Sequence, residues 1–248
     1  MYDTRIARFW GVDPLTKDYP MLTPFQFASN TPIWGVDIDG LEVRVYLEAP
    51  QYYKGNVGHV FLSVGKGKDI VVYSYGRYGA LEKGKGKLNF TNVRGEGVLR
   101  RLTGDAATNF IKSNLFDNSV RVFEIGDANE NKIKKFFDNS FFNSGIPASE
   151  GKYTNDPTAK VIDSYDLFSN NCTTKTIEAI SISGSKEDFK TSKVIFVPYS
   201  WLGMGSSSTV KESIYSPADA LEYLNEHAKD GDNVRDMTKT LKDEYENK

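Results

Sequence analysis

The chain has 248 residues, of which 39% are hydrophobic and 13% aromatic, which is enough to build a substantial core. Its 31 basic and 33 acidic residues give a formal charge of -2, so no overall field draws it onto nucleic acid or an anionic membrane. A single cysteine excludes an intramolecular disulfide, and no stretch has the apolar length of a signal peptide or a membrane-spanning helix. We therefore expect a globular chain with no membrane span.

The first 42 residues differ in composition from the rest of the chain. They hold Pro14, Pro20, Pro24 and Pro32 among the nine prolines of the chain. Closely spaced prolines prevent long helices and interrupt strands, so this segment is predicted to form turns and short extended pieces.

From residue 43 onward the pattern is that of a compact α+β domain. Residues 58–64 and 70–75 alternate as two strands of a hairpin around the Gly-Lys-Gly-Lys-Asp turn, the first as a half-buried strand. The other predicted strands are 42–47, 121–125 and 193–198, and the predicted helices are 105–116, 129–142, 172–180 and 217–228, the last capped by Ser216.

Lysine and arginine gather between Lys83 and Arg101, among glycines. Such a stretch is usually a solvated hairpin loop, and we expect no nucleic-acid contact from it. A nuclease would also need a His/Asp/Glu cluster for metal-assisted cleavage, and none is readable. We expect no cofactor and no metal.

Cys172 follows Ser-Asn-Asn and opens a helical pattern. A lone cysteine is more often a buried small hydrophobe, but polar flanks make an apolar slot less favourable here. At a helix N-terminus, free N–H groups and the macrodipole favour the thiolate. We therefore expect Cys172 to be a reactive thiolate.

His59 lies on the first strand of the hairpin and is one of only two histidines. An imidazole within hydrogen-bond reach of a cysteine is the pairing that nucleophilic catalysis requires. Hairpin spacing places Tyr73, Ser74 and Tyr75 nearly opposite His59, and we expect Ser74, with Tyr75 as the alternative, to orient the ring. Ordinary packing roles for these strand residues remain open. The other histidine, His227, lies on a charged helix and is assigned no role.

Two resemblances to known families follow from these residues. The blocks Tyr2-Asp3-Thr4-Arg5-Ile6-Ala7-Arg8-Phe9, Val12-Asp13-Pro14-Leu15, Thr23-Pro24-Phe25-Gln26-Phe27-Ala28-Ser29-Asn30-Thr31-Pro32-Ile33 and Asp37-Ile38-Asp39-Gly40-Leu41 resemble the end of the core of rearrangement-hotspot (Rhs) repeat-associated proteins. In that family a variable C-terminal toxin follows, and Asp37 and Asp39 match positions associated with self-cleavage. Ile38 stands where the family usually has proline, and the family's upstream shell repeats are absent.

The second resemblance lies in residues 43–248. Gly58-His59-Val60 and Asn171-Cys172-Thr173-Thr174, in this order on a strand and a helix, resemble circularly permuted papain-like hydrolases. The resemblance implies an antiparallel sheet with a cysteine-bearing helix and acyl transfer through Cys172 and His59, with helix N–H groups in the oxyanion hole.

The expected function is that of an Rhs-associated antibacterial toxin that hydrolyses an amide in peptidoglycan or a target protein. Acyl transfer or lipid-directed chemistry on the same scaffold and a non-catalytic binding toxin are the alternatives. The resemblance also implies export by type VI secretion or a related machine, without a signal peptide and from the producer's cytoplasm into target bacteria. It implies a cognate immunity protein as partner.

Overall fold

The structure is a computed structural model that describes residues 2–3, 8–9, 42–51, 56–78, 93–117, 120–198, 205–231 and 233–246. The chain divides into two compact units, residues 1–41 and 42–248. In the first, β1 (Tyr2–Asp3) and β2 (Arg8–Phe9) form a short antiparallel pair. Most of this unit, including Asp37 and Asp39 and therefore the expected self-cleavage motif, lies outside the described residues.

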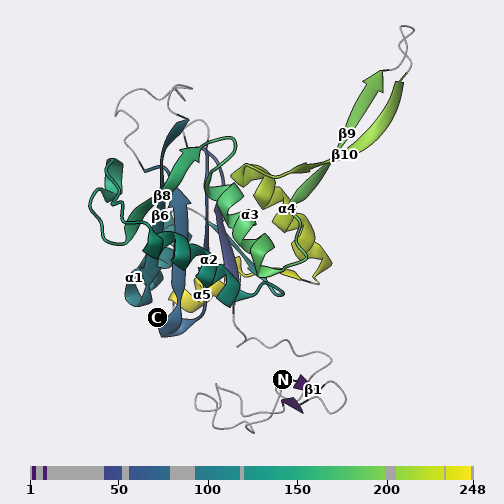
Figure 1. Cartoon of the computed structure of the whole chain (residues 1–248). Helices are drawn as coiled ribbons and strands as arrows, with labels where there is room; N and C mark the ends of the chain where they lie inside the picture. The colour runs from purple at the N-terminus through teal and green to yellow at the C-terminus, as the bar shows by residue number, and fades with distance from the viewer. Residues whose placement is uncertain are drawn as a thin grey trace. The chain divides into compact units, whose positions relative to one another are not determined.

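The second unit is an α+β domain built on one antiparallel sheet of seven strands in the order β11-β7-β3-β4-β5-β6-β8 (Figure 1). The α+β prediction is thus confirmed. The strands are β3 (Val43–Glu48), β4 (His59–Val64), β5 (Val71–Gly76), β6 (Arg94–Thr103), β7 (Arg121–Ile125), β8 (Ala159–Asp166) and β11 (Val234–Asp236).

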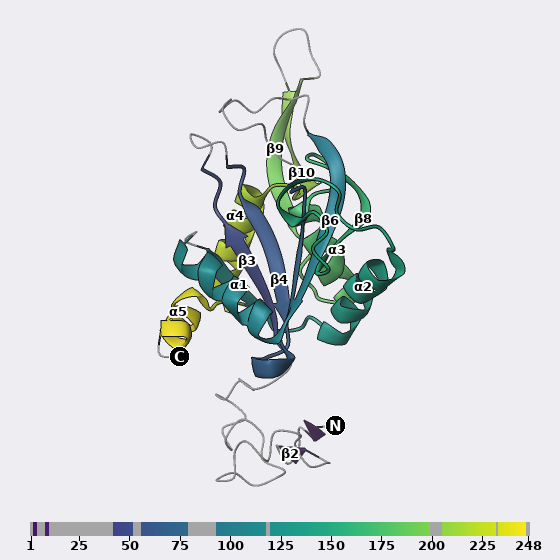
Figure 2. The ribbon, with the colours of Figure 1, turned by 90° about the vertical axis from the view of Figure 1, so that its left-hand side faces the viewer.

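Helices cover both faces of this sheet. On one face, α1 (Gly104–Asp117) and α5 (Thr238–Glu246) pack on the cluster that contains Tyr46, Phe61 and Val72; Figure 2 views the sheet from the side of α1. The other face is covered by α2 (Glu130–Asn143), α3 (Cys172–Ser183) and α4 (Pro217–Asp230). We call these the α1 face and the α3 face.

Strand β4 is central, and side-chain alternation sends Val60, Leu62 and Val64 to the α3 face and Phe61 to the α1 face. The predicted hairpin is present, since β4 pairs with β5 and the 3-10 turn Gly67–Asp69 connects them. The prediction of a half-buried strand is wrong, because the helices on both sides leave only His59 partly exposed.

The predicted helices and strands are present, with ends shifted by a few residues. The strand predicted at 193–198 is longer and forms, with β10 (Gly205–Ser213), a hairpin of its own as β9 (Lys190–Pro198), which extends from the domain (Figure 1). The prediction missed β6, β8, β10, β11 and α5.

The expected solvated basic loop is only partly described, because Lys83, Lys85 and Lys87 lie outside the described residues. Arg94, Arg100 and Arg101 instead lie on β6, where Arg94 is paired with Asp166 and Arg101 with Asp138. For these arginines the loop prediction is wrong, because their segment forms a strand that pairs with β5 and β8. Among the described residues, no helix is long and apolar enough to cross a membrane.

Candidate active site around Cys172

Cys172 is the first residue of α3, as predicted. The helix begins there because Asn171 forms a capping box: its side-chain oxygen accepts the N–H groups of Thr173 (2.9 Å) and Thr174 (3.0 Å), and the Thr174 hydroxyl accepts the N–H of Asn171 (2.8 Å). Two of the helix N–H groups expected in an oxyanion hole are therefore already bonded. The N–H of Cys172 is not bonded by Asn171 and acts on the sulfur of its own residue.

The side-chain amide of Asn171 also fixes the approach to the helix. Its Nδ2 donates to the carbonyl of Leu167 at 2.7 Å and to the carbonyl of Tyr215 at 2.9 Å. Asn171 is almost fully buried, and one side chain thus joins α3 to the turn before it and to the segment that leads into α4. The position of Cys172 is held by this amide.

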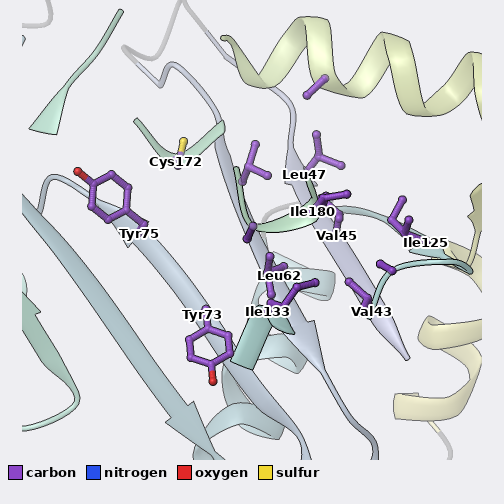
Figure 3. Close-up of a cluster of buried hydrophobic side chains, with 14 of the residues drawn as sticks. Val43, Val45, Leu47, Leu62, Tyr73, Tyr75, Ile125, Ile133, Cys172 and Ile180 are labelled. Carbon is purple, nitrogen blue, oxygen red and sulfur yellow. The ribbon is translucent and has the colours of Figure 1, made fainter. Parts of the chain in front are cut away.

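The Cys172 thiol lies on the α3 face, at the point where β4 and β5 separate. The last residues that pair between these strands are Leu62 and Tyr73. The same register would pair Val60 with Tyr75, but these two residues do not pair. The N–H of Val60 instead donates to the sulfur of Cys172. Figure 3 shows Cys172 and Tyr75 at one end of the buried cluster of this face.

The ionisation expected for Cys172 is not found. Burial raises the pKa of the thiol, and the N–H of Val60 and the hydroxyl of Thr173 lower it by less. The side chain is only 6% exposed, so the loss of hydration outweighs the helix N-terminus. The direction of this pKa shift runs against the expected resting thiolate, because burial favours the neutral thiol.

His59 begins β4 directly after Gly58, which has a φ of +83°. A Cβ on Gly58 would lie 2.7 Å from the carbonyl oxygen of Glu48, so this turn into the strand requires glycine. The ring Nε2 of His59 lies 2.8 Å from Oγ of Ser74, which lies 2.8 Å from the hydroxyl of Tyr78. The structure thus brings together His59 and Ser74, the residue expected to orient it.

The imidazole is held neutral in this position. Burial lowers the pKa of His59 to about 4, and the positive charge of Arg100 lowers the pKa further in the same direction. With Nε2 engaged by Ser74, Nδ1 has no hydrogen-bond partner among the described residues. It is the nitrogen available to accept a proton.

The structure does not bring Cys172 and His59 into contact. The sulfur lies beside the backbone of Val60 on the α3 face, whereas the imidazole packs on the α1 face with Phe61, at a ring separation of 6.1 Å. No hydrogen bond joins the sulfur to the ring among the described contacts. The two groups flank the open end of the β4–β5 ladder, so a turn of the His59 side chain around this end is needed for them to meet.

A polar network beside the thiol was not predicted from the sequence. The hydroxyl of Tyr75 donates to Asp163 of β8, and Asp163 forms an ion pair of 3.0 Å with Lys175 of α3. Asn170 donates to the same hydroxyl at 3.2 Å. Gly97 permits this arrangement, because a Cβ there would lie 2.3 Å from the Tyr75 hydroxyl.

His227 is placed as expected, outside this site. Its Nδ1 lies 2.8 Å from the carbonyl of Tyr223, one turn earlier in α4, and its ring stacks on Tyr223 at 3.8 Å. In the part of the chain that the structure describes, no three His, Cys, Asp or Glu side chains could hold a metal ion. No protein-family model, curated protein or solved structure matches the chain.

Proposed function

We propose that residues 43–248 are a papain-like cysteine hydrolase domain and that the chain is an Rhs-associated antibacterial effector. The observation that carries the proposal is the bond from the Val60 N–H to the Cys172 sulfur, which places the thiol one residue along β4 from His59. The Rhs part, with its delivery machine and immunity protein, is supported by the sequence blocks of residues 1–42.

In the proposed reaction, His59 acts as a general base on a neutral thiol. After its ring turns to the end of the β4–β5 ladder, Nδ1 takes the proton of Cys172 as the sulfur attacks an amide carbonyl. The imidazolium then protonates the leaving nitrogen, which gives a thioester. Water, deprotonated by His59, hydrolyses the thioester and regenerates the thiol.

Two further groups have parts in this scheme. In the resting structure Ser74, bonded to Nε2, holds the ring on the α1 face, and its bond to Tyr78 fixes the hydroxyl in turn. The ring leaves Ser74 when it turns toward the thiol. The N–H of Cys172 is the donor for the oxyanion, because the Asn171 side chain engages the next two N–H groups. Because the Cys172 thiol and the His59 imidazole are both neutral at the start, the buried site does not have to hold a thiolate and an imidazolium before the reaction.

A groove of mixed polar and apolar lining suits a peptide. It has a volume of about 640 Å³, runs along β8 and the end of α2, and is lined by polar residues such as Asn139 and Asn143 together with Ile146 and Ile162. Asp163 lines the groove and also accepts the hydroxyl of Tyr75 beside the thiol. An apolar groove would instead have favoured lipid.

Expression in a test bacterium examines the proposal. The full chain is produced in the cytoplasm, and separately in the periplasm behind an added signal peptide, as wild type, Cys172→Ala, His59→Gln and His227→Gln. We expect growth arrest in one compartment with wild type and His227→Gln, and normal growth with the other two. A folded Cys172→Ala protein that remains fully toxic would exclude the hydrolase in favour of a binding toxin.

A further inference from the structure

Arg100 is a buried cation that has no acidic partner among the described residues. It lies on β6 opposite Ser74, and the residue is 8% exposed. Its guanidinium carbon lies 3.8 Å from the ring centroid of Tyr153 and 5.2 Å from that of Phe110, and its Nε has no hydrogen-bond partner. The side chain is thus held between two aromatic rings.

The neighbouring arginines of the same strand differ in this respect. Arg94 is paired with Asp166 and Arg101 with Asp138, whereas no carboxylate among the described residues pairs with Arg100. Contact with aromatic faces stabilises a desolvated guanidinium, but by less than the burial of an unpaired ion costs. Among the described residues, the site therefore lacks an anion that would offset the charge of Arg100.

The guanidinium faces the same polar cluster as the His59 ring. Arg100 pairs across the sheet with Ser74, whose Oγ binds Nε2 of His59, and its charge acts on the pKa of that imidazole. Tyr78 closes the cluster, with its ring 6.4 Å from that of His59 and 4.7 Å from that of Tyr153. His59, Tyr78, Tyr153 and Phe110 are each partly exposed, so solvent reaches the rim of the cluster, whereas Ser74 and Arg100 are buried.

We propose that Arg100 binds a carboxylate of the substrate next to His59. A guanidinium presents a planar fork of donors that matches the two oxygens of a carboxylate, and the Nε of Arg100, in contact with the rings of Tyr153 and Phe110, has no hydrogen-bond partner among the described residues. A single positive charge balances a monoanion and would undercompensate a phosphate dianion. This inference rests on the proposed function, because it names the substrate class as peptides that carry a carboxylate near the scissile amide.

NMR of the full chain with labelled histidine measures such binding without turnover. The protein has only two histidines, so His227 is an internal reference for His59. Sodium acetate is titrated at constant ionic strength, with acetamide as the neutral isostere and inorganic phosphate as the competing anion. We expect acetate to shift the His59 resonances saturably and to raise the pKa of His59, because a bound anion offsets the Arg100 charge. His227 should not respond.

Two variants decide whether Arg100 is responsible. Arg100→Gln should abolish the acetate response, and Arg100→Lys, which keeps the charge but loses the fork, should weaken acetate binding about tenfold. Should Arg100→Gln fail to fold, the Arg100→Lys comparison decides alone. An equal response to acetate and acetamide, or undiminished binding in Arg100→Lys, would overturn the proposal, and a response to phosphate alone would overturn the carboxylate assignment.

Failure of the proposed carboxylate site can be distinguished from failure of the proposed hydrolase function. Acetate binding is measured without catalysis, so its failure leaves the role of Cys172 untouched. A fully toxic Cys172→Ala protein that still binds acetate through Arg100 would remove the hydrolase and keep the anion site.

Discussion

The sulfur of Cys172 accepts the backbone N–H of Val60, the residue that follows His59 on β4. This bond takes the place of the next backbone pair between β4 and β5. It fixes the start of α3 at the point where the two strands separate. Val60 contributes no side-chain chemistry to the arrangement. Its backbone nevertheless holds the thiol of Cys172, on α3, beside the residue that follows His59 on β4.

Protonation of His59 should destabilise the protein in acid. The pKa of His59 is lowered to about 4 in the folded state, from an ordinary value near 6.5. The corresponding stability is fully present above pH 6.5 and is lost as pH falls toward 4, by up to about 3 kcal/mol at 1.36 kcal/mol per pKa unit. Urea unfolding across this range should show the fall in wild type and His227→Gln. An equally steep fall in His59→Gln would assign it to other groups.

Removal of the Asn171 side chain should cost more than removal of an ordinary helix cap. Asn171→Ala loses two accepted and two donated hydrogen bonds in a buried position. We expect a loss of about 3 kcal/mol in the free energy of unfolding, compared with about 1 kcal/mol for Asn129→Ala. Asn129 is the matched control, because it caps α2 through a single bond to the N–H of Lys132 and is exposed. Equal losses of unfolding free energy in the two variants would show that the bonds from Asn171 to the carbonyls of Leu167 and Tyr215 add no stability.

Tyr75 and Tyr73 provide a second matched pair. Both lie on the same face of β5, and their hydroxyls donate to Asp163 and Asp138 respectively. Each Tyr→Phe change should lower stability by about 2 kcal/mol, since a buried bond to a charged acceptor is lost. Only Tyr75→Phe also removes the acceptor of Asn170, two residues before the thiol.

Alkylation of native Cys172 distinguishes the two changes. The thiol is buried and its pKa is raised, so iodoacetamide should react slowly in wild type, through local opening. Tyr75→Phe should accelerate the reaction several-fold relative to Tyr73→Phe at equal global stability. Identical rates in the two variants would indicate that the Tyr75 network does not hold the site.

Local patterns were sufficient to predict parts of this site. Asn171 before a helical pattern predicted the position of Cys172, and the hairpin spacing predicted Ser74 beside His59. Both features depend on residues close together in sequence, where capping and strand register follow from short-range geometry.

Features that depend on distant packing could not be predicted. Arg94, Arg100 and Arg101 among glycines are typical of a loop, and that segment is a strand because it pairs with β5 and with β8. Residues 159–166 lack a clear alternation because β8 is an edge strand whose middle is only partly buried. The face to which His59 turns and the burial that keeps Cys172 neutral were unpredictable for the same reason, since both depend on which helices cover the sheet.

Acetylation by p-nitrophenyl acetate, followed by mass spectrometry of intact and digested protein, tests most directly whether His59 activates Cys172. We expect a burst of nitrophenolate with one acetyl group on Cys172, at equal rates in wild type and His227→Gln. The burst should be about a hundredfold slower in His59→Gln, because that variant lacks the general base. A folded wild-type protein without acetyl on Cys172, or a His59→Gln protein acetylated there as fast as wild type, would contradict the account.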